Sequence, residues 1–169
     1  MNKAVFLDRD GTIIKDKSYM YKINQIEFFD KTFEGLEKFQ KNGYLLIIIT
    51  NQSGVAKGMF TKKQALMFNK SVVNKLLDSN IAIKDTFFCF HNPKDNCECR
   101  KPKQKLLFEA VKKYNIDLSK SVVIGDKESD VLMSKNTKLK SILISDKKVD
   151  TSANFIVADL SEAFDVLHI

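Results

Sequence analysis

The chain has 169 residues, of which 44% are hydrophobic and 29% are charged, and its net charge is +7. This length and composition predict one globular domain over residues 1–169, and no apolar run approaches the ~20 residues that a membrane-spanning helix needs. The chain enters an apolar strand and a motif at once, which leaves no room for a signal peptide. We therefore expect a cytoplasmic protein without a membrane partner.

The positive charge is compatible with an anionic partner, either nucleic acid or a phosphorylated small molecule. Only two of the 28 basic residues are arginines, Arg9 and Arg100, and the lysines are scattered along the whole chain. Arginine is the usual residue for reading bases and for binding phosphate with two hydrogen bonds. We interpret most of the charge as solvated lysines and expect no nucleic-acid partner.

Six apolar runs have the length of buried strands, and segments with helical periodicity separate most of them. The predicted strands cover residues 4–7, 45–49, 86–90, 121–124, 141–144 and 154–157. The predicted helices cover residues 31–42, a long segment that begins at Thr61, residues 104–114 and residues 160–167. Strands that alternate with helices predict an α/β fold, a doubly wound parallel sheet with helices on both faces. The connection at about residues 145–153 is short for a crossover helix.

Two carboxylates follow the first predicted strand. Asp8 and Asp10 come directly after apolar residues 4–7, and Gly11 ends the strand in a turn. Side chains two residues apart point to the same side of an extended chain, where two acids repel each other unless a cation or a shared proton holds them. Mg²⁺ prefers carboxylate oxygens and fits this pair, whereas the alternative is two solvated acids in a turn. The mostly polar residues 12–29 form either a pocket wall or a surface loop.

Two later strands are also predicted to end in polar residues. Residues 50–53 (Thr-Asn-Gln-Ser) follow the second strand and offer neutral hydrogen-bond donors to an oxyanion, although such residues are also common in turns. Asp126 follows the fourth strand, and Asp130 lies one helical turn further on. Because ligands bind at the carboxyl edge of a parallel sheet, Asp126 is a candidate to share a cation with Asp8 and Asp10. Asp130 either holds that cation through water or orients a neighbouring lysine.

Every cysteine of the chain lies in one short segment. Cys89, Cys97 and Cys99, together with His91, form a Cys₃His set in the pattern C-x-H, five residues, C-x-C. This is the usual composition of a closed tetrahedral zinc site, in which each pair clamps the ion from its own side. Buried thiols and a disulfide are the alternatives, and a cytosolic setting argues against the disulfide. We expect a structural zinc ion that holds a loop in place and offers no open position for catalysis.

Two cations follow the predicted zinc loop directly. Arg100 and Lys101 come after Cys99, and Pro102 precedes the next predicted helix. If a metal clip holds this loop, the pair is positioned to bind phosphate. The second histidine, His168, has no partner that the sequence suggests, and we interpret it as structural or solvated.

Four motifs together resemble the haloacid dehalogenase (HAD) superfamily of phosphotransferases, namely Asp8-x-Asp10-Gly11-Thr12, Thr50-Asn51, Lys101 and Gly125-Asp126-x-x-x-Asp130. The resemblance spans about residues 3–145 and implies a HAD-like Rossmannoid fold. It also implies that Asp8 attacks phosphorus, that Asp10 acts as general acid and base, and that Thr50 and Lys101 stabilise the transferring phosphoryl group. Mg²⁺ would be held by Asp8, the main-chain carbonyl of Asp10, and Asp126.

Within this superfamily, residues 6–12 and 89–102 resemble the zinc-containing histidinol-phosphatase and heptose-bisphosphatase group, in its capless form without a lid domain. Residues 50–61 and 125–127 are most similar to the heptose-bisphosphatase members. That similarity implies substrate contacts by Asp16, Lys17, Ser18, Tyr19, Asn51, Gln52, Ser53, Arg100 and Lys127.

The resemblance implies a monomeric, Mg²⁺-dependent hydrolase that removes the 7-phosphate of D-glycero-D-manno-heptose 1,7-bisphosphate, for the ADP- or GDP-heptose of surface polysaccharides such as lipopolysaccharide. Three other functions remain open: a histidinol-phosphate phosphatase, a nucleic-acid 3′-phosphatase, and a non-catalytic binding module stabilised by zinc. The sequence has no track of basic and aromatic residues such as single-strand binders use, and a binding module needs no nucleophile.

Overall fold

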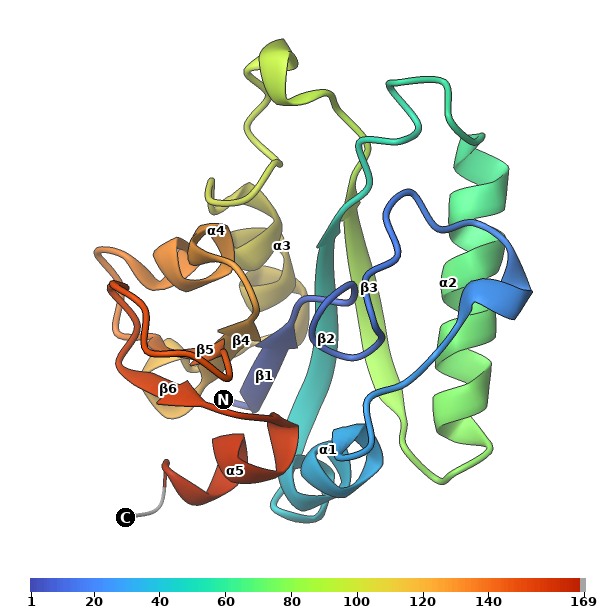
Figure 1. The fold of residues 1–169 in the computed structure, drawn as a ribbon. Helices are drawn as coiled ribbons and strands as arrows, with labels where there is room; N and C mark the ends of the chain where they lie inside the picture. Colours follow the sequence, from blue (N-terminus) through green and yellow to red (C-terminus); the bar gives the residue numbers. More distant parts are fainter. Residues whose placement is uncertain (168–169) are drawn as a thin grey trace.

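The computed structural model describes residues 1–167 as alternating strands and helices (Figure 1). The strands are β1 (Lys3–Leu7), β2 (Tyr44–Asn51), β3 (Ile83–Cys89), β4 (Val122–Gly125), β5 (Lys140–Ile144) and β6 (Phe155–Val157). The α-helices are α1 (Thr32–Lys41), α2 (Lys62–Leu77), α3 (Lys105–Tyr114), α4 (Glu128–Val131) and α5 (Leu160–Asp165). Short 3₁₀ turns cover Ile23–Gln25, Pro93–Asp95, Leu118–Lys120 and Leu132–Ser134. His168 lies outside the described residues.

The strands form one six-stranded sheet in the order β3-β2-β1-β4-β5-β6, and all of their pairings are parallel. The chain moves outward in one direction from β1 to β3, then crosses to β4 and moves outward in the other. This is the doubly wound arrangement that the alternation of strands and helices predicts. Over residues 1–167, no helix is long and apolar enough to cross a membrane.

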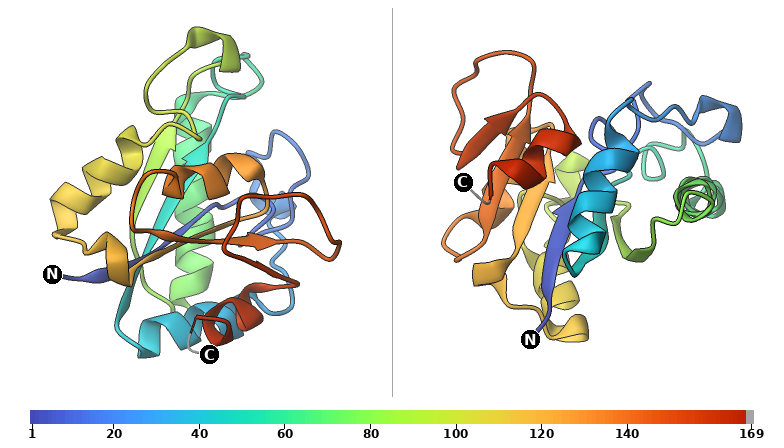
Figure 2. Two further views of the ribbon diagram at one scale, coloured as in Figure 1. Left: turned by 90° about the vertical axis from the view of Figure 1, so that its left-hand side faces the viewer. Right: turned by 90° about the horizontal axis from the view of Figure 1, so that it is seen from below.

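Each face of the sheet buries its own hydrophobic core, and helices cover both faces (Figure 2). Along β1, Val5 and Leu7 pack toward α1, α2 and α5, whereas Ala4 and Phe6 pack toward α3. Both sets are fully buried because alternate side chains of a strand point to opposite faces. The central strand is therefore immobilised on both sides, which fixes the position of the residues that follow it.

The connection between β5 and β6 holds no helix, in agreement with its short length. The two strands nevertheless pair in parallel, with Ile142 opposite Phe155. Side-chain hydrogen bonds hold the loop instead of helix packing: the Glu128 carboxylate accepts the N–H of Ser152 at 3.1 Å, and the Asn154 side-chain oxygen accepts the N–H of Ser141 at 2.8 Å.

Helix α4 spans only four residues, Glu128–Val131, too few for a periodic pattern to reveal it in the sequence.

The contact between α1 and α5 depends on Gly35. A Cβ atom at this position would lie 2.3 Å from the main-chain oxygen of Leu160, so one of the two helices would have to move. Alanine favours a helix over glycine by about 1 kcal/mol, but overpacking against main-chain atoms costs about 1–3 kcal/mol. We expect Gly35→Ala to lower the free energy of unfolding by about 1–2 kcal/mol in urea titrations. Glu37→Ala, on the exposed side of the same helix, should change it by less than about 0.5 kcal/mol; equal effects would contradict the packing argument.

Candidate active site

The sheet reverses its direction of growth between β1 and β4, and ligands bind in open parallel sheets at such a point. Asp8 follows β1 and Asp126 follows β4, so both carboxylates lie at the carboxyl edge of adjacent strands. Beside them is a cavity of about 280 Å³. The residues expected from the sequence that line it are Asp8, Asp10, Asp16, Ser18, Tyr19, Asn51, Gln52, Ser53, Arg100, Lys101, Lys127 and Asp130.

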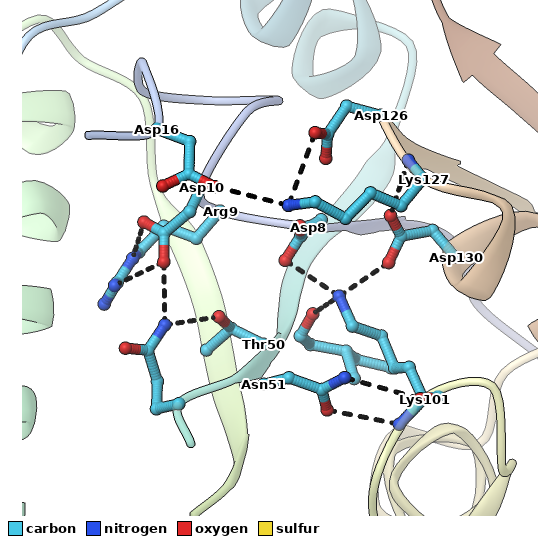
Figure 3. Close-up of polar contacts among 12 residues, drawn as sticks. Asp8, Arg9, Asp10, Asp16, Thr50, Asn51, Lys101, Asp126, Lys127 and Asp130 are labelled. Atoms are coloured by element: carbon cyan, nitrogen blue, oxygen red, sulfur yellow. Dashed lines mark hydrogen bonds and ion pairs between the residues drawn. The ribbon is translucent and has the colours of Figure 1, made fainter. Parts of the chain in front are cut away.

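Lys101 is a buried cation between two carboxylates (Figure 3). Its Nζ lies 2.8 Å from Asp8 Oδ1 and 2.7 Å from Asp130 Oδ1, and it also donates to the carbonyl oxygen of Ile49 at 2.8 Å. The Asn51 side chain braces the Lys101 main chain by accepting its N–H at 3.1 Å. Of the two roles expected for Asp130, the structure therefore has the one in which it orients a lysine. Burial alone would lower the pKa of Lys101, but Asp8 and Asp130 raise it, which keeps the amine charged.

The carboxylates of Asp8, Asp126 and Asp130 converge, with one oxygen of each within 4.8 Å of the others. Lys101 and the N–H of Lys127 bind Asp130, which leaves Asp8 and Asp126 available to a cation. Asp126 Oδ1 is buried and has no hydrogen-bond partner among residues 1–167. A buried acceptor without a partner, beside a second carboxylate, fits a hard cation such as Mg²⁺.

Gly11 lets Asp126 approach the turn after β1. Its φ is +93°, and a Cβ atom there would lie 2.2 Å from Asp126 Oδ2. Any side chain at this position would therefore displace the Asp126 carboxylate, in addition to straining a backbone conformation that favours glycine.

Burial and neighbouring charge also shape the protonation of the acidic cluster. Burial raises the pKa of Asp8 to about 6, with Asp130 and Asp10 acting in the same direction and Lys101 against it. Burial and the charge of Asp8 likewise raise the pKa of Asp126. A shared divalent cation would relieve this repulsion and favour both anions, so the electrostatics of the pair agree with a metal site.

Asp10 lies in the cavity wall with its carboxylate turned toward Arg9 (Figure 3). Nε and Nη2 of Arg9 donate to Oδ1 and Oδ2 of Asp10, each at 2.8 Å. Nε2 of Gln52 donates to Asp10 Oδ2 at 2.8 Å and to Thr50 Oγ1 at 2.9 Å. Gln52, expected from the sequence to contact substrate, thus links the Asp10 carboxylate to the Thr50 hydroxyl.

The segment after β1 forms a cavity wall together with the segment after β2. The rings of Tyr21 and Phe60 stack with centroids 5.6 Å apart, and Lys57 Nζ donates to the Tyr19 hydroxyl at 2.6 Å. Ser18 and Tyr19 have φ values of 58° and 47°, a left-handed conformation that is uncommon outside glycine. Of the two alternatives for residues 12–29, the structure has the pocket wall.

The two arginine and lysine side chains predicted as a phosphate-binding pair have separate environments. Lys101 is engaged by carboxylates, whereas Arg100 lines the cavity with a buried Nη1 that has no partner in the described part of the chain. Lys127 is a second cavity cation, with Nζ 3.4 Å from carboxylate oxygens of both Asp16 and Asp126. Burial alone would lower the pKa of Lys127, but the negative charges of Asp126, Asp8 and Asp16 raise it by more than burial lowers it. The side chain therefore stays charged.

Three residues predicted for this site do not line the cavity: Asp126, which lies beside it, Lys17 and Thr50. Lys17 forms an ion pair with Glu27, at 2.7 Å between Nζ and Oε2, and does not line the cavity. Thr50 is 1% exposed and lies behind Gln52. Four residues that the sequence analysis did not assign to the site individually also line the cavity: Met20, Gly54, Phe60 and Ser129. Met20 lies in the segment predicted as a possible pocket wall, Gly54 and Phe60 lie within residues 50–61, and nothing in the sequence singled out Ser129.

The loop that follows β3 lies at the top of Figure 1. The ligand atoms of the four predicted zinc ligands lie within 4.8 Å of one another. Cys99 Sγ lies 2.9 Å from Cys89 Sγ and 3.1 Å from His91 Nδ1, and Cys97 Sγ lies 3.6 Å from both other sulfurs. The three cysteines are free thiols, so the disulfide alternative does not hold. Burial raises the pKa of Cys89 to about 12, so a thiolate there requires a cation nearby. Three sulfurs and one imidazole nitrogen around one point are a donor set that fits zinc.

Comparisons with known proteins agree with this fold. A family model described as polynucleotide kinase 3 phosphatase matches residues 3–160. The chain is 36% identical over 174 residues to D-glycero-beta-D-manno-heptose-1,7-bisphosphate 7-phosphatase of Pasteurella multocida, covering 96% of this chain and 95% of the relative. It is 38% identical over 169 residues to the protein of the same name in Helicobacter pylori, covering 98% of each. The structure of D,D-heptose 1,7-bisphosphate phosphatase from B. bronchiseptica, complexed with magnesium and phosphate, matches 98% of each chain with a TM-score of 0.84 and 21% identity.

The fold and the family match define a phosphatase of the HAD-like class, a hydrolase of phosphate esters. More narrowly, the chain belongs to the family of D-glycero-D-manno-heptose-1,7-bisphosphate 7-phosphatases, which it matches over nearly its whole length. The resemblance drawn from the sequence motifs and the predicted doubly wound α/β fold are both confirmed.

Proposed function

We propose that this chain is a Mg²⁺-dependent phosphatase that removes the 7-phosphate of D-glycero-D-manno-heptose 1,7-bisphosphate. The observation that carries this proposal is the buried ion pair of Asp8 and Lys101, at 2.8 Å, in a cavity whose wall also holds Arg100 and Lys127. It combines a nucleophile with cations for two phosphate groups. Relatives 36% and 38% identical that are named for this reaction support the choice of substrate.

In the proposed reaction, Asp8 is the nucleophile. One of its oxygens forms a bond to phosphorus while the bond between phosphorus and the sugar oxygen breaks, and Asp10 donates a proton to that oxygen. The product is an aspartyl-phosphate on Asp8. Asp10, now a carboxylate, takes a proton from water as the water oxygen attacks phosphorus, which releases inorganic phosphate and restores Asp8.

Lys101 and the Thr50 hydroxyl would stabilise the charge that spreads over the phosphoryl oxygens. A magnesium ion would be held by Asp8, Asp126 and the main-chain carbonyl of Asp10, where it would neutralise phosphoryl charge as a Lewis acid. The donor set described above and the magnesium in the B. bronchiseptica structure support this assignment.

The second phosphate of the substrate would contact the two cavity cations that have no role in the proposed phosphoryl transfer. Arg100 has a buried Nη1 without a partner in residues 1–167, and Lys127 lies across the same cavity. A guanidinium binds phosphate oxygens with paired hydrogen bonds. The cavity volume of about 280 Å³ is at the small end of the range for small-molecule sites and suits one sugar. We further propose that residues 1–169 act as one domain in a cytoplasmic monomer.

The proposal is tested by phosphate release with Mg²⁺ from four substrates in parallel: the alpha and beta anomers of the heptose bisphosphate, histidinol phosphate, and an oligonucleotide with a 3′-phosphate. The oligonucleotide is included because of the name of the matching family model. We expect the highest kcat/KM for one heptose anomer, and loss of turnover when Mg²⁺ is chelated. Preference for histidinol phosphate or the oligonucleotide would replace the substrate but keep the mechanism. No release from any substrate would reject the proposed function.

We also propose that zinc occupies the cluster of Cys89, His91, Cys97 and Cys99 and holds Arg100 and Lys101 in place. Cys99→Ser should abolish bound zinc in metal analysis and lower kcat/KM by about 10-fold or more, because the loop no longer positions those cations. Glu98→Ser is the matched control, since the Glu98 side chain is 74% exposed and forms an ion pair with Lys103. Full zinc content and activity in Cys99→Ser would contradict this proposal.

A further inference from the structure

Arg9 has an unusual environment for a charged residue. It is fully buried, and it is the largest fully buried side chain among residues 1–167. Its guanidinium lies over the ring of Phe68 in α2, 4.8 Å from the ring centroid, and Nη1 has no hydrogen-bond partner among residues 1–167. Arginine stays protonated in proteins, and a buried charge is costly unless an opposite charge compensates it. Burying the Arg9 charge therefore costs free energy of folding, which favourable contacts of the guanidinium must offset.

The compensating charge is Asp10. Arg9 binds both carboxylate oxygens of Asp10 with parallel hydrogen bonds of 2.8 Å, the geometry that holds a carboxylate in one plane and one rotamer. The Phe68 ring and the surrounding core keep the guanidinium from rotating, while Gln52 holds the same carboxylate from the β2 side. Asp10 is 18% exposed and lines the cavity, so the two buried hydrogen bonds from Arg9 act directly on a group of the cavity wall.

The hydrogen bonds distinguish the two oxygens of Asp10. Oδ2 accepts from Arg9 Nη2 and from Gln52 Nε2, which uses both of its lone pairs. Oδ1 accepts only from Arg9 Nε among the donors of residues 1–167, so it retains one lone pair. Oδ1 is therefore the oxygen that has an open position for a further hydrogen bond, in the fixed plane that Arg9 imposes.

We propose that Arg9 is a positioning residue that holds the Asp10 carboxyl group in the one plane and rotamer from which Oδ1 can form a hydrogen bond with the leaving-group oxygen. This inference rests on the proposed function, because it assumes a phosphatase in which Asp10 is the general acid. Arg9 acts through Asp10 and touches no substrate atom. It should therefore matter most for substrates whose leaving oxygen needs a proton.

The test measures the activity of the Arg9→Met variant on two substrates. The variant keeps an apolar side chain against Phe68 and removes the guanidinium that makes both hydrogen bonds to Asp10. The ratio kcat/KM reports only steps up to formation of the aspartyl-phosphate, so later hydrolysis does not obscure the result. For an alkyl phosphate such as the heptose bisphosphate, we expect a loss of about 10²-fold, the size of a general-acid contribution. For p-nitrophenyl phosphate, whose leaving group departs without a proton, we expect a loss of less than about 5-fold.

A double-mutant cycle with Asp10→Asn shows whether Arg9 acts through Asp10. In that background, adding Arg9→Met should lower kcat/KM for the alkyl phosphate by less than about 3-fold. If Arg9→Met does not fold, Arg9→Lys serves instead, since it keeps the charge but lacks the two-pronged geometry, and the same dependence on leaving group is expected. Equal losses on both substrates, no loss on either, or full additivity in the cycle would overturn the inference. Inactivity of the unmodified enzyme on all phosphate esters would instead reject the proposed function itself.

Discussion

Replacing Asp8 with asparagine is expected to lower kcat on the heptose bisphosphate by about 10⁴-fold or more, because an amide cannot form the phosphoryl bond that a carboxylate forms. The folded protein should persist. Burial raises the pKa of Asp8 to about 6, above its ordinary value, so the ionised side chain costs stability at neutral pH. Without Mg²⁺, Asp8→Asn should therefore be at least as stable as the unmodified protein at neutral pH, and this advantage should shrink as the pH falls through about 6.

Steady-state phosphate release and urea unfolding over a pH series measure both effects. Asp146→Asn is a suitable control, because Asp146 is exposed in the loop between β5 and β6, away from the cavity, and should change neither quantity. Residual activity of Asp8→Asn within 10²-fold of the unmodified enzyme would show that Asp8 is not the nucleophile.

Replacing Lys101 with methionine should have the largest effect on stability. The change removes the cation shared by Asp8 and Asp130 while leaving both carboxylates almost completely buried. Breaking a buried ion pair by removing one partner costs about 3–5 kcal/mol, since the remaining charge is uncompensated. We expect a loss of this size in urea unfolding near neutral pH, together with loss of phosphatase activity. The loss should become smaller at lower pH, because the Asp8 carboxylate, whose pKa burial raises and Lys101 lowers, binds a proton more tightly in the folded variant than in the unfolded chain.

Lys105→Met provides a matched control, since Lys105 is exposed at the start of α3 only a few residues away. It should alter the free energy of unfolding by less than about 0.5 kcal/mol. Unfolding of both variants at the same urea concentration would mean that the charge of Lys101 does not stabilise the fold. In that case, the structural role assigned to the Asp8–Lys101–Asp130 contacts would be wrong.

The elements of the fold were largely predictable because their signals are local. Apolar runs such as residues 45–49 became the interiors of strands, and Thr61 begins α2 as its capping residue, accepting the N–H of Gln64. The strand that was predicted at residues 86–90 runs over Ile83–Cys89, because pairing with β2 extends it toward its N-terminus. Strand order and the packing of Gly35 against Leu160 depend on contacts between distant segments, which no local pattern encodes.

Spacing and chemistry alone reveal the acids that follow β1 and β4, namely Asp8, Asp10 and Asp126, and the Cys₃His set that begins at the end of β3. The role of each side chain depends on contacts that exist only in the folded chain. Lys101 lies between carboxylates, Lys17 pairs with Glu27 instead of lining the cavity, and Arg9 is turned inward to Asp10. The physical reason is that a buried charge takes whatever partner the packed chain brings within hydrogen-bond distance, and Asp8 and Lys101 are 93 residues apart in the sequence.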